Sequence, residues 1–259
     1  MARKWAKFPH GDASYAYAGA ALKKAWERLH RGDCEPFPGD PKVADAWRKF
    51  HAGAFQDAVE SGHAAGGAGV NAAVKAQCVH ANYLEPDAKQ RLALFEEAAA
   101  WANDRRAAAP RDANAHYLYA FALGRYGQGI SVAKALAQGF GGKIRDALET
   151  ALGLAPRHAE AAAALGAYQS EVIDKVGGLV AGLTYGAKKD SALRSFEQAV
   201  KLFPESPIVH IEYANGLILL FGKSRLDDAT RLYQKAASAT AADAMERLDV
   251  ELAKSELAG

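Results

Sequence analysis

Alanine-rich amphipathic runs, each followed by a proline, recur through the second half of the chain. The prolines stand at positions 110, 156 and 204, at intervals of 46 and 48 residues. In the run that ends at Pro204, Ala192, Phe196 and Ala199 place a small, a large aromatic and a small residue on one helix face. Small residues let two helices approach closely, while the large one fills the groove between neighbours. The pattern therefore predicts repeated, closely packed helices.

Other runs carry the same arrangement in register. Two further triplets have comparable spacing: Ile144, Leu148 and Ala151, then Ala229, Tyr233 and Ala236. Ten residues past each proline lies a small residue with a larger apolar residue directly before it. These pairs are Tyr119 with Ala120, Leu165 with Gly166, and Tyr213 with Ala214. Each repeat is therefore predicted to hold a first and a second helix that touch at a small residue.

This pattern resembles the tetratricopeptide repeat (TPR) superfamily, in a divergent form with enlarged repeats. The resemblance implies an all-α fold, a right-handed α-solenoid of TPR-like helical hairpins with N- and C-terminal capping helices. It covers residues 43–240 and is clearest over 111–240. Before that, Gly53, Phe55 and Ala58 match the family's turn glycine, aromatic residue and small residue.

The rest of the pattern predicts the elements around the clearest repeats. Apolar periodicity predicts helices over 70–83 and 87–109. Residues 13–30 are expected to form an amphipathic helix which, with the loop after it, makes an N-terminal cap over 1–42. A charged helix within 241–259 is expected to cap the other end, so that the repeats lie between two caps.

Two apolar, glycine-rich inserts lengthen the repeats that begin at 111 and 157. They fall between first and second helix, at 127–142 and 173–188. Insertions in a solenoid tend to map to one face, often the binding face. The inserts could close a cavity, or they could occupy the groove and move the binding surface to their outer side; the sequence leaves both arrangements open.

Composition then narrows the classes of function. The net charge is +2 with acidic and basic residues mixed along the chain, so we expect no nucleic-acid partner. No apolar stretch approaches the roughly 20 residues of a membrane-spanning helix, so no transmembrane segment is expected. The first ten residues carry positive charge without an apolar core behind them, which favours an unprocessed, cytoplasmic chain.

No pattern indicates catalysis, a cofactor or a metal. Cys78 and His80 alone are too few ligands for a zinc site, and no sequence pattern marks a catalytic base for either cysteine. The segment 139–143 lacks the strand and the Ser or Thr that a phosphate-binding loop requires. His116 and His210 occupy equivalent repeat positions, which indicates helix-interface residues. We therefore expect a protein that is not an enzyme and holds no cofactor.

Projecting the groove positions of TPR proteins onto this sequence gives a candidate partner-binding groove. Its residues are Asn114, Tyr117, Phe121, Arg125, Glu160, Glu171, Ile211 and Asn215, with Ala163 and Ile208 beside them. This groove is expected to be aromatic and aliphatic with few charges. A clamp for a partner's C-terminal carboxylate is not expected, because Tyr117, Ala163 and Ile211 stand at its positions and only Asn215 fits.

The resemblance implies binding: a protein-protein interaction scaffold or adaptor that takes a peptide or helix in the solenoid groove. The partner is an unidentified protein or peptide, and a second copy of the chain, in a homo-oligomer, is one candidate. The alternative is a small-molecule or lipid-binding helical-repeat protein whose inserts, 127–142 and 173–188, close a cavity.

Overall fold

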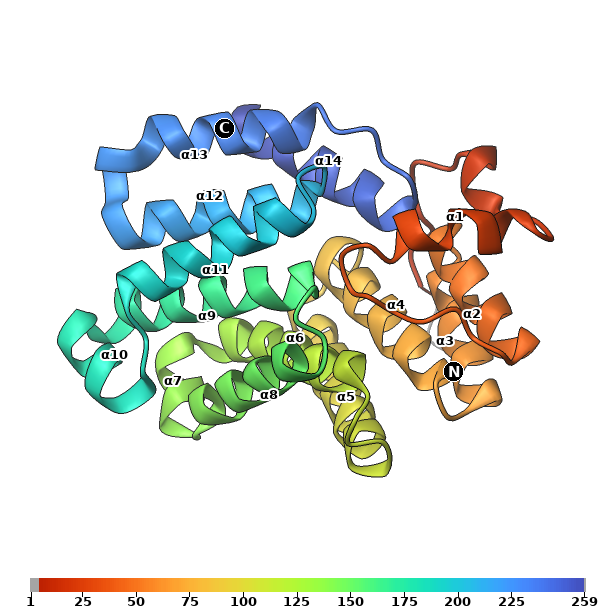
Figure 1. Ribbon diagram of the computed structural model, residues 1–259, viewed down its shortest axis with the longest axis horizontal. Helices are drawn as coiled ribbons and strands as arrows, with labels where there is room; N and C mark the ends of the chain where they lie inside the picture. Colours follow the sequence, from red (N-terminus) through yellow and green to blue (C-terminus); the bar gives the residue numbers. More distant parts are fainter. Residues whose placement is uncertain (1–4, 259) are drawn as a thin grey trace.

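The structure is a computed structural model that describes residues 5–258, and all regular structure in this range is helical (Figure 1). The α-helices are α1 (Ala21–Leu29), α2 (Pro41–His51), α3 (Phe55–Ala65), α4 (Gly69–Tyr83), α5 (Ala88–Ala108), α6 (Ala113–Ile130), α7 (Val132–Ala137), α8 (Phe140–Leu154), α9 (Ala159–Val176), α10 (Gly178–Tyr185), α11 (Lys189–Leu202), α12 (Pro207–Phe221), α13 (Leu226–Ala237) and α14 (Ala244–Ala258). Two short 3-10 helices are η1 (Ala13–Ala16) and η2 (Gly222–Arg225). The predicted all-α fold is confirmed, and α4 and α5 match the helices predicted at 70–83 and 87–109.

The helices pair into hairpins that stack as a solenoid. The pairs are α2 with α3, α4 with α5, α6 with α8, α9 with α11, and α12 with α13. The first helices α4, α6, α9 and α12 each contact the next in the series. This is the architecture that the proline-delimited repeats predicted, because each hairpin can bury its apolar face only against a neighbouring hairpin.

The first helix of each clear repeat begins at a side-chain cap two residues after the proline. Asp112, His158 and Ser206 accept hydrogen bonds from the backbone N–H groups three residues further on. These caps satisfy donors that the start of a helix leaves without a partner. His116 and His210 have matching roles, because the Nε2 of each bonds the carbonyl oxygen of the proline six residues earlier, at 3.0 and 2.8 Å. The two histidines therefore hold the turn before each helix.

Phe196 on α11 is the central packing residue of the third repeat. Its side chain is completely buried between α9 and α12, and its ring stacks on Tyr213 with 5.0 Å between centroids. Gly166 of α9 and Gly216 of α12 face the ring, and a Cβ atom at Gly166 would lie only 2.9 Å from it. The predicted pairing of small residues with this large aromatic residue is confirmed.

The two inserts form short helices at one end of the molecule, α7 and α10 (Figure 1). Each lies between the first helix of a repeat, which is 18 residues long in both cases, and the second helix of the same repeat. Gly177 and Gly186 have φ angles of +79° and +67°, which allow the sharp turns on either side of α10. The extra residues therefore extend the solenoid at its edge and leave the hairpin stack uninterrupted.

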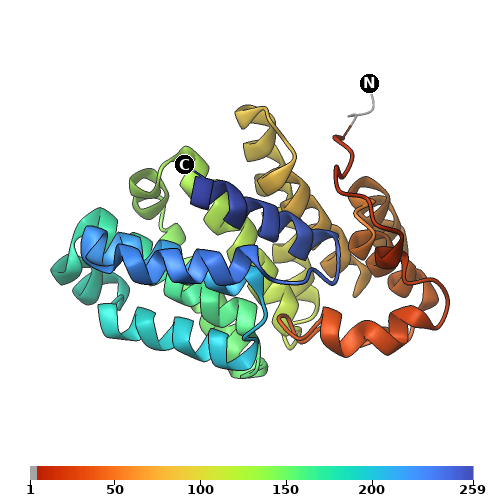
Figure 2. The same cartoon turned by 90° about the horizontal axis from the view of Figure 1, so that it is seen from above.

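The N-terminal segment returns to the C-terminal helix and joins the two ends of the solenoid (Figures 1 and 2). Arg28 makes a bidentate ion pair with Glu246 of α14, at 2.6 and 2.9 Å. The Tyr17 hydroxyl donates to the carbonyl oxygen of Ala242 at 2.6 Å, and His51 bonds Asp243 at 2.7 Å. The stack is thus closed on one side by contacts between residues more than 190 positions apart.

The expectation of one helix over 13–30 is wrong. The segment forms η1 and then α1, and the two are separated by left-handed residues, Tyr17 at φ +43° and Gly19 at φ +57°. The break lets Tyr17 turn toward the α13–α14 loop. The division of the chain into 1–42, 43–240 and 241–259 stays a prediction. Residues 1–4, which begin the stretch expected to be unprocessed, and residue 259 lie outside the described residues. Within 5–258 no helix has the length and apolar character needed to cross a membrane.

We predict that Gly216→Ala destabilises the protein. The added methyl group would overlap the buried Phe196 ring, and overpacking of this kind costs about 1–3 kcal/mol. Thermal unfolding of the purified variant measures the loss. Gly153→Ala is the matched control, because Gly153 lies in α8 with open space around it, and there we expect a small gain. Equal melting temperatures for the two variants would contradict this account of the packing.

Candidate functional site

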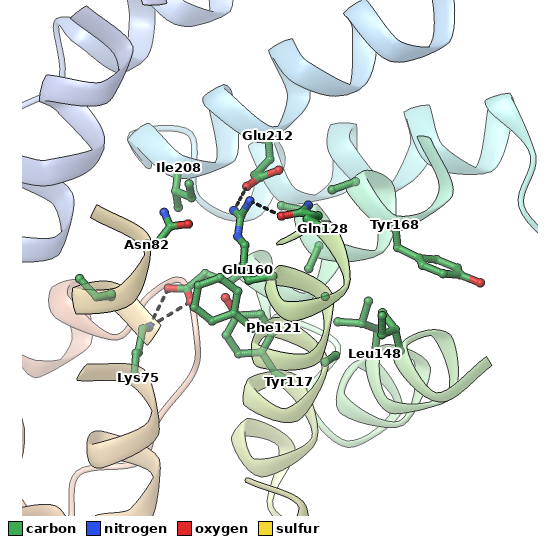
Figure 3. Close-up of a pocket in the computed structure, with 18 of the residues that line it drawn as sticks. Lys75, Asn82, Tyr117, Phe121, Gln128, Leu148, Glu160, Tyr168, Ile208 and Glu212 are labelled. Atoms are coloured by element: carbon green, nitrogen blue, oxygen red, sulfur yellow. Dashed lines mark hydrogen bonds and ion pairs between the residues drawn. The ribbon is translucent and has the colours of Figure 1, made fainter. Parts of the chain in front are cut away.

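A pocket lies on the inner face of the solenoid, where the first helices of successive hairpins face one another (Figure 3). Helices α4, α6, α9 and α12 contribute side chains, and α8 and α14 complete the lining. Counted together with the solvent at its open mouth, the empty space of the pocket is about 890 Å³. Its place matches the groove in which helical-repeat proteins receive ligands.

Helical periodicity decides which side chains reach the pocket. On α6, Tyr117, Phe121 and Arg125 follow one another at intervals of four residues and share one helix face. On α9, Ala163 and Ala167 take the corresponding positions. Because these alanines are short, the wall formed by α9 stands back from the Phe121 ring, and space remains between the helices.

The middle of the pocket is apolar. Val79 of α4, Leu148 of α8 and Ile208 of α12 line it together with Phe121. The Tyr117 and Phe121 rings lie parallel, with an angle of 1° between planes and 6.1 Å between centroids. These rings give a flat, rigid surface against which an apolar group can pack.

One end of the pocket holds a buried lysine between two carboxylates. The Nζ of Lys75 lies 2.6 Å from Asp33. It also lies 3.0 Å from both carboxylate oxygens of Glu160 (Figure 3). Although burial alone would raise it, the Lys75 ammonium and the His30 ring hold the pKa of Asp33 well below its usual range. Lys75 is therefore charged and fully engaged, and it is not free to act as a nucleophile.

The other end holds an arginine that spans two helices. The Arg125 guanidinium donates to Glu212 at 2.6 Å and to Gln128 at 3.1 Å (Figure 3). Gln128 in turn donates a short hydrogen bond to Glu171. Burial raises the pKa of Glu171 to about 7, and the nearby Arg125 only partly offsets that effect. The charge of Glu171 therefore changes near neutral pH.

Asp249 of α14 gives the pocket a carboxyl group with unused hydrogen-bonding capacity. Its side chain is 1% exposed; one oxygen accepts a short hydrogen bond from the Tyr83 hydroxyl, and Oδ2 has no hydrogen-bond partner among the described residues. Burial, helped by the charge of Glu246, raises the pKa of Asp249 well above its usual range. The lining holds two cationic side chains and four carboxyl groups: Lys75 and Arg125, then Glu160, Glu171, Glu212 and Asp249. The pocket thus has an excess of acidic groups.

A buried chain of hydrogen bonds connects the pocket with the closure of the solenoid. From the Lys75 partner Asp33, it runs to His30 Nδ1 at 2.9 Å, from His30 Nε2 to His51 Nε2 at 3.2 Å, and from His51 Nδ1 to Asp243 at 2.7 Å. The Nδ1 of each ring faces a carboxylate, and the two Nε2 atoms face each other. Burial lowers the pKa of His30 to about 4.

The structure brings five of the eight predicted groove residues to the pocket. They are Tyr117, Phe121, Arg125, Glu160 and Glu171. The additional positions Ala163 and Ile208 line it as well.

The other three predicted groove residues lie elsewhere. Asn114 is buried beneath the pocket, where its amide donates to Glu35 at 2.6 Å and its oxygen bonds His158 at 3.0 Å. Ile211 packs in the apolar core between α12 and α13. Asn215 is exposed at the rim of a neighbouring pocket and accepts a hydrogen bond from Tyr233.

One expectation about the groove is wrong, and one of the two arrangements left open for the inserts is not found. The groove was expected to hold few charges, but six ionisable side chains of Lys, Arg, Asp and Glu line the pocket. The inserts at 127–142 and 173–188 do not close it, because only Gln128 of the two inserts belongs to its lining. Helix α14 covers this side of the pocket instead. The sequence predicted α14 only as a C-terminal cap.

Sequence reasoning missed the contributions of α4 and α14. Lys75, Val79 and Tyr83 recur every four residues on α4, so their shared face was visible in the sequence. Met245 and Asp249 on α14 have the same spacing. However, no local signal in the sequence indicates that α14 folds back toward α4. Met245 and Asp249 could therefore be assigned to the pocket only from the structure.

The described residues carry little that suggests chemistry. No group of three or more His, Cys, Asp or Glu side chains in residues 5–258 could hold a metal ion. Cys78 is buried, and burial raises the pKa of its thiol far above the usual range, which makes it a poor nucleophile. The arrangement is suited to holding a ligand between apolar walls and charged ends.

The fold and the groove define this chain as a helical-repeat protein with a TPR-like fold. A crystal structure of a thermophilic TPR protein from Thermus thermophilus is similar, with a TM-score of 0.56 and 17% sequence identity over 82% of this chain and 97% of that chain. The chain belongs to the family described as Regulator of microtubule dynamics protein 1-3, whose match covers residues 70–256. None of the curated proteins matches it.

We predict that Glu35→Gln makes the protein more stable at alkaline pH. Burial and the nearby Asp33 charge raise the pKa of Glu35 from 4.5 to about 8. The pKa of Glu35 is higher in the folded protein than in the unfolded chain. The contribution of Glu35 to the free energy of unfolding is therefore complete below pH 4.5 and is lost as the pH rises through 8. The glutamine keeps an oxygen acceptor for Asn114 without this loss.

The melting temperature of the Glu35→Gln variant, minus that of the unchanged protein, is expected to rise by about 3 °C or more between about pH 6 and pH 9. Glu149→Gln serves as control, since the Glu149 side chain is 60% exposed and we expect a constant difference there. A constant difference for Glu35→Gln would contradict the prediction.

Proposed function

We propose that this chain is an interaction protein that binds a short segment of a partner protein in the pocket. In this proposal an apolar side chain of the segment packs on Phe121 and Tyr117, and a basic group faces Asp249. The observation that carries the proposal is the combination of apolar walls with a buried carboxyl oxygen that has no hydrogen-bond partner among the described residues. The repeat architecture supports it, because TPR-like grooves commonly receive peptides.

The closure of the solenoid favours a short segment over a whole helix. A helix with its side chains measures about 10–12 Å across and needs a groove that is open along its length. Here the Tyr83–Asp249 hydrogen bond joins α4 to α14 beside the pocket. The space that remains suits one or a few side chains.

The charges favour a basic group on that segment. Lys75 is shared between two carboxylates and Arg125 is paired with Glu212, so neither cation is available to pair with Asp249. A lysine, arginine or amino terminus of the partner would donate to Oδ2 of Asp249 and favour the ionised form of that carboxyl group. Hydrogen bonds to charged groups in such buried places contribute about 1.5–3 kcal/mol each.

Selection from a library of random peptides tests this proposal without a known partner. We expect the unchanged protein to enrich peptides in which an apolar residue stands next to lysine or arginine. Phe121→Ala and Asp249→Asn are each expected to weaken binding of an enriched peptide by about tenfold or more, measured by calorimetry. Phe37→Ala is the matched control, because Phe37 is 40% exposed and lies outside the pocket. Enrichment of acidic peptides, or unchanged binding by both pocket variants, would refute the proposal.

The same peptide is expected to bind more tightly at about pH 8 than at about pH 6. Burial raises the pKa of Glu171 to about 7, so this group gains negative charge between about pH 6 and pH 8. A basic peptide pairs best with the ionised carboxylates, and we expect a change in Kd of about 3- to 10-fold. In the Glu171→Gln/Asp249→Asn double variant the pH dependence should disappear. Tighter binding at the lower pH would contradict the charge argument.

The family description names the regulation of microtubule dynamics, so tubulin is the first protein partner to test. Pelleting with microtubules assembled from purified tubulin, with the unchanged protein and Phe121→Ala side by side, shows whether this partner uses the pocket. A second copy of the chain is the other partner to test, by sedimentation. The cytoplasmic location expected from the sequence stays a prediction.

A small amphiphilic molecule is the second candidate ligand. The apolar walls of the pocket, with a few polar groups at the ends, have the composition that is usual for small-molecule sites. Native mass spectrometry of the freshly purified protein distinguishes the two candidates, because a retained small ligand adds a defined mass. That mass is expected to be lost in Phe121→Ala if the ligand occupies this pocket.

A further inference from the structure

Helix α10 carries the two most exposed large apolar side chains of the described residues. Leu183 is 81% exposed and Leu179 is 78% exposed, with Val180 beside them at 47%. Only Ala181 of this helix is buried. Single apolar residues on a surface need no explanation, but three together on one short helix indicate a contact surface.

The position of this helix is fixed by its neighbours, so the exposure of its leucines is built into the fold. Arg145 of α8 donates to the carbonyl oxygen of Tyr185, at 3.4 Å. Gly141 of α8 lets the Tyr185 ring approach closely, since a Cβ atom there would lie 3.1 Å from the ring. Tyr185 thereby anchors the inner side of α10 while Leu179 and Leu183 stay in solvent.

Exposed lysines flank α10 along the chain. Lys175 stands before α10 and Lys188 after it, and both are exposed. The other insert lies at the same end of the molecule and adds the exposed Lys134 (Figures 1 and 2). Across the two inserts, 127–142 and 173–188, these three lysines are accompanied by a single acidic residue, Asp174. The two inserts at this end of the solenoid, which we call the tip, therefore combine exposed apolar side chains on α10 with an excess of lysines.

We propose that this tip docks on an anionic lipid surface, with Leu179 and Leu183 entering the headgroup region and the lysines pairing with lipid headgroups. Peripheral proteins bind membranes through a few apolar side chains flanked by cations. A stable protein interface buries about 800 Å² on each partner, which one short helix cannot supply. The charge pattern and the small apolar area therefore fit a lipid surface better than a second protein. This inference concerns a different surface from the pocket and does not depend on the function proposed for it.

Co-sedimentation with vesicles tests the proposal. The probes are vesicles of phosphatidylcholine alone and of phosphatidylcholine mixed with phosphatidylglycerol. We expect the unchanged protein to pellet with the mixed vesicles and to be released by high salt. The Leu179→Ser/Leu183→Ser and Lys175→Glu/Lys188→Glu variants are expected to bind about tenfold or more weakly. These side chains are exposed, so circular dichroism is expected to show an unchanged fold.

Leu154→Ser is the matched control, because Leu154 lies on α8, is 38% exposed and is not part of the tip. It is expected to bind vesicles as the unchanged protein does. Equal binding to both kinds of vesicle, no binding to either, or unaltered binding by the double-serine variant would overturn the proposal. So would sedimentation that shows a dimer lost in the double-serine variant, because the tip would then be an interface between two copies of this chain.

Discussion

The arrangement of this molecule depends on the buried ion pair that Lys75 forms with Asp33 and Glu160. The three side chains come from α4, from the loop after α1 and from α9, so the pair joins segments that are far apart in the sequence. A buried charge is costly unless it is paired and hydrogen-bonded, and each of these groups has its partner only in the folded molecule. Gly32 permits the approach, because its carbonyl oxygen accepts from the Glu160 backbone and a Cβ atom there would lie 2.8 Å from the Glu160 carboxylate.

This ion pair also relates the pocket to the closure of the solenoid. A chain of hydrogen bonds runs from Asp33 through His30 and His51 to Asp243, at the start of α14. The same α14 presents Asp249 to the pocket. An open row of hairpins would offer a long groove, whereas this closed one offers a compact pocket with apolar walls and acidic groups. The two surfaces for which we propose ligands are separate. The pocket lies inside the solenoid, and the apolar tip of α10 lies outside it.

Much of the fold was predictable because it rests on local repetition. The spacing of Ala192, Phe196 and Ala199 identified a second helix, and the small residues across from it were confirmed where Gly166 meets the Phe196 ring. Periodicity also placed Tyr117, Phe121 and Arg125 on the face that lines the pocket. Ile211 was misassigned, because a groove position projected from a regular repeat does not account for how α12 is turned against α13.

The sequence by itself determined the helices, the hairpins and the face of α6 and α9 that points inward, since these follow from contacts between residues close in the chain. Only the tertiary structure decided that α14 returns to Tyr83 of α4 and that the inserts stay outside the pocket. It alone brought Asp33 to Lys75. The physical reason is that a single polar residue carries no periodic signal: whether it is a surface charge or half of a buried ion pair depends on a partner that folding brings to it.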